Sequence, residues 1–122
     1  MSFKFENLNV WKVALELSVD VNEIVKSFPK DEMYVLTSQI KRASDSISLN
    51  IAEGCTGQTD KKFNRFLGYA LRSCVEVVGC IYLAKGRNLL DESQFNNLYE
   101  KLLALTKLLQ SLRKSLKKKS DD

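Results

Sequence analysis

The sequence contains no histidine, one proline and three cysteines, and these scarcities exclude several kinds of site. Without histidine the usual general base is missing, so a serine or cysteine nucleophile has only Lys, Asp or Glu to activate it. A structural zinc site takes four nitrogen or sulfur ligands, and three thiols do not supply them. We therefore expect no metal and no cofactor, and we find no arrangement of residues that predicts catalysis.

The three cysteines, Cys55, Cys74 and Cys80, are odd in number and have no CxxC spacing. This pattern is typical of reduced thiols in the cytoplasm rather than of a disulfide framework. Cys74 lies on an apolar stripe and is predicted to be a small core residue. Cys55 lies in a predicted loop and is the cysteine we expect to be reactive.

Long apolar runs are also missing. No segment approaches the roughly 18 apolar residues that a membrane span requires. The N-terminal segment lacks the apolar stretch and small-residue cleavage site of a secretory signal. The sequence therefore predicts a cytoplasmic protein with no membrane partner.

What is present is the composition of one soluble globular domain covering residues 1–122, with 44% hydrophobic and 28% charged residues. Lysine and arginine number 19 against 15 acidic residues, which gives a formal charge of +4. The sequence pI is about 9.0. This modest excess is compatible with a polyanionic partner but does not establish one.

Apolar residues recur alternately three and four positions apart in four separate stretches, which is the spacing that keeps one face of a helix against a neighbour. We predict helices over about 8–28, 31–53, 60–85 and 92–117, with a basic tail over 113–122 that frays. The connections are short and no strand-like alternation is present. The pattern therefore predicts an all-α, antiparallel up-down-up-down four-helix bundle.

Local signals mark the expected helix ends. Asn7 or Asn9 can cap the first helix, and Pro29 stops it. Gly54 is expected to end the second helix in a left-handed conformation. Thr59 or Asp60 can cap the third helix, and Asp91 with Gln94 resembles a capping box for the fourth.

The third predicted helix has more apolar surface than a four-helix core requires. Leu71, Val75 and Tyr82 form a strip beside its main stripe, and Gly68 and Gly79 lie on nearly the same side. Two aligned glycines indicate a place where another backbone comes close. Either this strip is a second contact surface, or the bundle is simply wide there.

The segment 38–54 reads Ser-Gln-Ile-Lys-Arg-Ala-Ser-Asp-Ser-Ile-Ser-Leu-Asn-Ile-Ala-Glu-Gly and fixes polar as well as apolar positions. Further matching positions flank it: Leu8, Val10, Trp11, Ala14, Phe28, Pro29, Glu32, Tyr34, Leu36, Phe63, Phe66, Leu67, Ala70, Ser73 and Glu76. With these residues the chain resembles the four-helix-bundle family of 23S rRNA intervening-sequence proteins, also called S23 ribosomal proteins.

The resemblance implies a small bacterial protein, some of whose relatives are encoded inside insertions in large-subunit rRNA genes. It also implies a homopentamer, because relatives are known as pentamers. The accessory protein of diversity-generating retroelements is similar in fold, pentameric and basic, and it binds nucleic acid. This chain has Lys41 where the family favours a second arginine, which lowers the positive charge of that face.

The polar face of the second helix is a candidate subunit interface. Arg42 and Asp45 are spaced to pair, but an exposed pair contributes only a few tenths of a kcal/mol, so stability alone does not explain this face. We hypothesise that it packs between subunits, where paired charges fix register. The candidate interface residues are Arg42, Asp45, Leu49, Asn50, Glu53, Gly68 and Gly79.

Basic residues form candidate nucleic-acid contacts in three clusters, on the third helix, in the turn after it and near the C-terminus. They are Lys61, Lys62, Arg65, Arg72, Lys85, Arg87, Arg113, Lys114, Lys117, Lys118 and Lys119. Taken singly, each cluster also fits an ordinary solvated surface. Aromatic residues that could stack on bases are sparse, so any binding should be electrostatic and steeply salt-dependent.

The sequence thus predicts a non-enzymatic homo-oligomer associated with RNA or another nucleic acid. The alternative is an oligomeric protein-binding scaffold whose basic surface serves only solvation. An enzyme with an unrecognised site is a third and more distant reading.

Overall fold

The structure is a computed structural model that describes residues 1–57 and 59–121, with side chains for 1–57 and 59–119. Four helices follow one another, namely α1 (Asn9–Ile24), α2 (Leu36–Gly54), α3 (Asp60–Gly86) and α4 (Glu92–Asp121). Short 3₁₀ turns occur at Lys4–Asn7, Val25–Ser27 and Lys30–Glu32. The described residues include no strand, which confirms the predicted all-α class.

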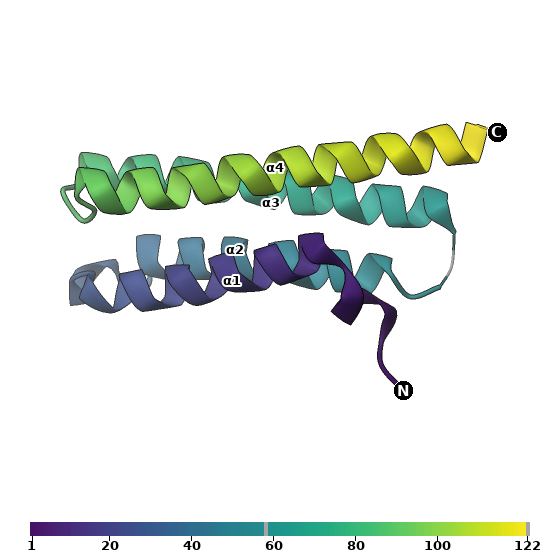
Figure 1. Ribbon diagram of the computed structural model, residues 1–122. Helices are drawn as coiled ribbons and strands as arrows, with labels where there is room; N and C mark the ends of the chain where they lie inside the picture. Colours follow the sequence, from purple (N-terminus) through teal and green to yellow (C-terminus); the bar gives the residue numbers. More distant parts are fainter. Residues whose placement is uncertain (58, 122) are drawn as a thin grey trace.

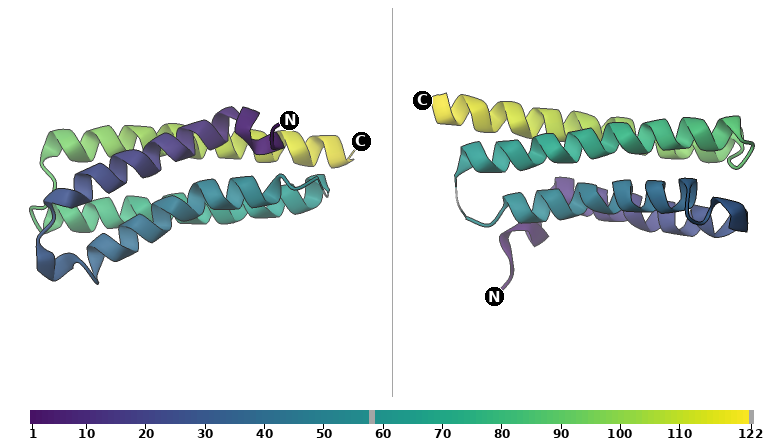
Figure 2. Two further views of the ribbon diagram at one scale, coloured as in Figure 1. Left: turned by 90° about the horizontal axis from the view of Figure 1, so that it is seen from below. Right: turned by 180° about the vertical axis from the view of Figure 1, so that it is seen from behind.

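Successive helices run in opposite directions, with α1 and α2 in one layer and α3 and α4 in the other (Figure 1). Two further views show the same pairs side by side (Figure 2). Both termini and the α2–α3 connection lie at one end of the bundle, and the other two connections lie at the opposite end. The predicted antiparallel bundle is confirmed.

The predicted apolar stripes form the core. Each helix contributes fully buried side chains, including Leu17, Val21, Ile40, Ile47, Leu67, Ile81, Leu98, Leu102, Leu105 and Leu109. Met33 lies inside the predicted helix 31–53 but is 48% exposed, because α2 begins only after it.

A polar contact joins each pair of neighbouring helices. Ser18 of α1 donates to Asp45 of α2, and the hydroxyls of Ser46 of α2 and Ser73 of α3 share a hydrogen bond. Arg113 of α4 donates to Asn64 of α3, and Lys101 of α4 pairs with Asp20 of α1. Such directional contacts favour one relative register of the helices, which apolar packing alone specifies less strictly.

The second helix begins at Leu36 rather than near Asp31. Pro29 is followed by a single 3₁₀ turn, and Val35 then adopts φ −120° and ψ −100°, outside the helical region. Glu32 in that turn accepts from Arg87 of the α3–α4 connection, with Nη1 3.0 and 3.1 Å from its two carboxylate oxygens. This contact holds the turn against the α3–α4 connection at the same end of the bundle.

The predicted capping residues of α1 and at the end of α2 do not have their expected roles in the structure. Leu8 precedes α1 without any side-chain cap, so neither Asn7 nor Asn9 has the predicted role. Gly54 is the last residue of α2 but has no positive φ, and the left-handed conformation occurs later, at Gly57 with φ 82°.

The signals before α3 and α4 are confirmed. The hydroxyl of Thr59 accepts from the Lys62 amide at 3.1 Å, so Thr59 rather than Asp60 is the cap of α3. Asp91 and Gln94 form the reciprocal capping box: the Gln94 backbone amide donates to Asp91 Oδ1 at 2.7 Å, and the Asp91 backbone amide donates to Gln94 Oε1 at 3.0 Å.

The basic tail does not fray over the described residues. Helix α4 continues to Asp121, whereas the sequence predicted an end near Lys117. Lys119 lies 3.8 Å from Asp60 in the first turn of α3, so the end of α4 still has a neighbour. Lysine, leucine and arginine are also good helix formers, and this favours continuation of the helix. Asp122 lies outside the described residues.

By length and composition alone, α3 is apolar enough to cross a membrane. A core helix of a bundle meets the same criterion. The apolar residues Phe63, Leu67, Ala70, Cys74, Val77, Ile81 and Ala84 of α3 all belong to the buried core.

Candidate nucleic-acid interface

Two basic clusters that are far apart in the sequence lie together at one end of the bundle. One follows Asp60 at the start of α3, and the other begins at Arg113 near the end of α4. Because α3 and α4 are antiparallel, the start of one helix lies beside the end of the other, as the Asp60–Lys119 contact shows. The fold therefore brings the positive charges of both clusters together at one end of the bundle.

A groove of about 400 Å³ lies where these clusters meet. It is lined by Lys61, Asn64, Arg65, Gly68, Tyr69, Arg72 and Arg113. Four of these side chains are cationic and none is acidic. Lys61, Arg65 and Arg72 are exposed, so their charged ends are available to a ligand.

Arg113 is the positioned cation of the groove. Its Nε donates to Asn64 Oδ1 at 2.8 Å. Its guanidinium covers Gly68, where an added Cβ would lie only 3.2 Å from the guanidinium carbon. Glycine at this position thus lets Arg113 lie flat on α3. The close approach predicted from Gly68 is made here by a side chain of the same chain.

One aromatic ring belongs to the groove. The guanidinium of Arg72 lies over the ring of Tyr69, 5.9 Å from its centroid. The rings of Tyr69 and Phe66 also pack edge to face, with their centroids 5.5 Å apart. An arginine held by an aromatic face loses less freedom when it binds an anion.

A second hollow of about 250 Å³ continues from the groove along α4. It is lined by Asn64, Leu71, Gln110, Arg113, Lys114 and Lys117. Lys118 and Lys119 are exposed on the last turns of α4, and Lys62 is half-buried near the start of α3. The basic surface therefore extends beyond the groove itself.

Lys85 and Arg87 do not join this surface. They lie at the opposite end of the bundle, where the α3–α4 connection turns. Lys85 Nζ lies 4.5 Å from the centroid of the Phe95 ring, and Arg87 pairs with Glu32. Both cations have partners within the chain, and neither lines the α3–α4 groove.

The candidate interface residues of α2 point in several directions. Asp45 accepts from Ser18 within the α1–α2 contact, so the predicted Arg42–Asp45 pair is not formed. Asn50 donates to the Ser46 carbonyl at 2.8 Å. Leu49 is 64% exposed, and Glu53 is also exposed.

The glycines of α3 differ from each other. Gly68 is covered by Arg113, whereas a Cβ added at Gly79 would meet nothing within 4 Å. Gly79 thus leaves an open strip next to Val75, which is 66% exposed, and Tyr82, which is 55% exposed.

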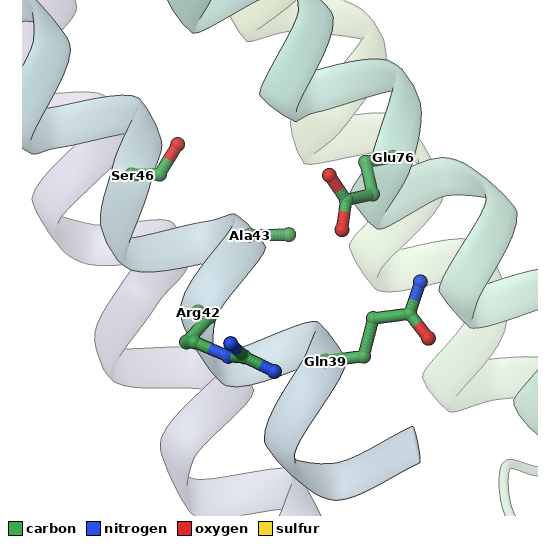
Figure 3. A pocket seen from close by; sticks show the side chains of 5 residues that line it. All are labelled: Gln39, Arg42, Ala43, Ser46 and Glu76. Atoms are coloured by element: carbon green, nitrogen blue, oxygen red, sulfur yellow. The ribbon is translucent and has the colours of Figure 1, made fainter. Parts of the chain in front are cut away.

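A polar recess of about 410 Å³ lies between α2 and α3 and includes Arg42 of the predicted subunit interface. It is lined by Gln39, Arg42, Ala43, Ser46 and Glu76. Figure 3 shows Gln39 and Arg42 reaching from α2 toward α3, and Glu76 reaching back from α3.

Comparison with known proteins shows what this bundle is. The model of the 23S rRNA-intervening sequence protein family matches residues 6–111. The chain belongs to that family. A similar solved structure is that of a protein of unknown function from the S23 ribosomal protein family of Bacteroides thetaiotaomicron, which is 25% identical. The match covers 86% of this chain and 98% of that one, with a TM-score of 0.80. No curated protein matches the sequence.

In this member of the family, four of the polar positions that carried the resemblance line the α2–α3 recess, namely Gln39, Arg42, Ser46 and Glu76. Gln39 and Arg42 belong to the segment 38–54, and Glu76 is one of its flanking matches. Sequence reasoning missed Gln39 and Glu76 as site residues. The signal was present, since polar positions that accompany an apolar motif are not explained by core packing.

The cysteines of this family member are buried, including Cys55, which was expected to be reactive. Burial raises the pKa of the Cys55 thiol, an effect that nearby Lys4 partly offsets. Burial likewise raises the pKa of Cys74 to about 12, against a smaller opposite effect of its hydrogen bond to Thr106. Burial raises the pKa of Cys80, and the negative charge of Glu76 raises it further. These thiols are poor nucleophiles at neutral pH because the thiolate is the reactive form.

Proposed function

We infer that this family member binds RNA or another nucleic acid without catalysing a reaction, and that the α3–α4 groove is the contact. One observation carries the proposal: Lys61, Arg65, Arg72 and Arg113 line a single groove, although Arg113 is remote from the others in sequence. Arg113 is held in place by Asn64, so part of its side-chain entropy is already lost before binding.

The ligand contacted by such a groove is a phosphate backbone. Arginine matches phosphate oxygens with paired donors, and lysine adds a mobile charge. The groove offers one aromatic ring, Tyr69, and no row of stacking side chains. The groove itself should therefore contribute affinity with little sequence selection.

Filter binding of a structured RNA across a salt series tests the function. If the four cations of the groove each neutralise one phosphate, log K should fall with log salt with a slope of about −3 to −4, as each phosphate contributes about −0.9. RNA that is not retained even at low ionic strength would reject the function and favour the protein-binding scaffold.

A second proposed property, self-association, rests on exposed apolar side chains on two different faces. Phe3 and Leu49 border a hollow of about 500 Å³ between the N-terminal segment and α2. Val75 and Tyr82 lie along the open side of α3. Two unlike surfaces favour a head-to-tail contact, which closes into a ring when the rotation between copies permits. The resemblance implies a ring of five.

Replacing Leu49 with glutamate is therefore expected to shift the assembly toward monomer, because the substitution places a charge in an apolar contact. Light scattering measures the mass directly. Leu108→Glu is the control, since Leu108 is also exposed, at 37%, but lies on α4 away from both faces. An equal mass for Leu49→Glu and the unmodified chain would contradict this contact.

A further inference from the structure

The recess between α2 and α3 contains two charges of opposite sign that do not neutralise each other. Arg42 and Glu76 both line it and both are exposed. Over the part of the chain that the structure describes, neither side chain forms a hydrogen bond or an ion pair. The Gln39 amide, which can donate and accept, points into the same space (Figure 3). The recess therefore presents both donors and acceptors to a ligand.

The recess adjoins the basic groove along α3. Glu76 follows Arg72 by four residues, so about 6 Å of helix separates them. A strand whose phosphates contact Arg65 and Arg72 can thus place a base beside Glu76.

We propose that the recess binds one unpaired guanine of the bound strand. This proposal rests on the proposed nucleic-acid function. Arg42 donates to the O6 and N7 acceptors of the base, the pairing that arginine makes most often with guanine. Glu76 accepts from the N1–H and N2–H groups on the neighbouring edge. Gln39 supplies a further amide contact.

The other bases match this arrangement less well. Adenine presents an amino donor where Arg42 requires an acceptor, and uracil offers one ring N–H instead of two adjacent donors. Cytosine has acceptors and an amino group, but it lacks the adjacent O6 and N7 acceptors that Arg42 requires. The N1–H and N2–H donors of guanine are used in a base pair, so the ligand is an unpaired segment rather than a regular duplex.

The volume of the recess suits this use. About 410 Å³ is within the range of roughly 300–1,000 Å³ found for ligand pockets. Its residues come from two helices that share the buried core and are joined by the Ser46–Ser73 hydrogen bond. The recess is therefore held by the bundle itself and not by a loop.

Fluorescence anisotropy with labelled oligouridine carrying one central guanosine tests the proposal. The guanosine strand should bind about tenfold to a hundredfold more tightly than the strand with adenosine at that place. Inosine, which lacks the N2 amino group, and 7-deazaguanosine, which lacks N7, should each lose part of the preference. Equal affinity for guanosine and adenosine, or a preference for cytidine, would overturn the proposal.

Two variants connect the preference to the recess. Glu76→Gln and Arg42→Gln should each reduce the ratio of guanosine to adenosine affinity toward one, while Glu100→Gln, an exposed carboxylate on α4, should keep that ratio. Salt-dependent binding without a base preference would reject the guanine site and leave the proposed function standing. Failure of all strands to bind at low salt would reject both.

Light scattering of a charge-reversal variant, Arg42→Glu, separates base recognition from subunit contact. If Arg42 is the interface residue that the sequence predicts, this charge reversal shifts the assembly toward monomer. If the guanine site is correct, the mass of the assembly stays unchanged while the preference for guanosine over adenosine is lost. A shift to monomer would assign Arg42 to the interface and overturn the proposal.

Discussion

Replacing Gly54 with alanine is expected to lower the free energy of unfolding by about 1–3 kcal/mol, the usual cost of overpacking a core. Gly54 is buried at the end of α2 against α3. An added Cβ would lie 2.6 Å from Phe66 Cβ and 3.1 Å from Phe63 Cδ1. The Phe66 Cβ is fixed to the backbone and cannot rotate away, so α2 and α3 would have to separate.

Urea unfolding followed by far-UV circular dichroism measures this loss. Gly79→Ala is the matched control, because Gly79 lies within α3 with nothing within 4 Å of an added Cβ. Alanine in a helix interior is more favourable than glycine by about 1 kcal/mol, so the control should gain stability. Equal changes at both positions would contradict the close α2–α3 contact, and a loss at Gly79 would point to a second subunit there.

Reversing two charges of the groove in an Arg65→Glu, Arg72→Glu double variant should weaken RNA binding at low salt about a hundredfold. The variant loses two phosphate contacts, so the slope of log K against log salt should become shallower by about 2. Both side chains are exposed, and neither bridges two helices in the structure. Folding should therefore be preserved, which circular dichroism checks.

The control is a double variant that changes the net charge by the same amount but lies outside the groove. Lys12 lies on α1 and Lys107 on α4, both exposed and outside the groove. A Lys12→Glu, Lys107→Glu variant should keep most of its affinity and its salt slope. If both double variants lose the same affinity, binding depends on overall charge and not on the groove.

Arg113 shows why the composition of the groove was only partly predictable. The sequence marked both basic clusters as candidates but could not place them together. The contact between Arg113 and Asn64 spans 49 positions and depends on how far α4 extends along α3. The local signal indicated that the C-terminal segment frays, whereas the helix continues and brings its cations beside those of α3.

Asp45 illustrates a second limit. Its spacing from Arg42 predicted a pair along one helix, and such pairs gain little free energy in water. In the structure Asp45 instead accepts from Ser18 of α1, a contact shielded by both helices. The choice between the two partners depends on the rotation of α2 about its axis, and the apolar stripe fixes this rotation only to within the width of the stripe.

The sequence by itself determined the helices, their antiparallel order and the side chains of the core. These follow from the spacing of apolar residues and from short connections, which act over a few turns of chain. Only the tertiary structure decided which polar residues meet, as in the α3–α4 groove and the α2–α3 recess. Those meetings depend on the axial shift and rotation of whole helices, and these are set by packing between residues far apart in the chain.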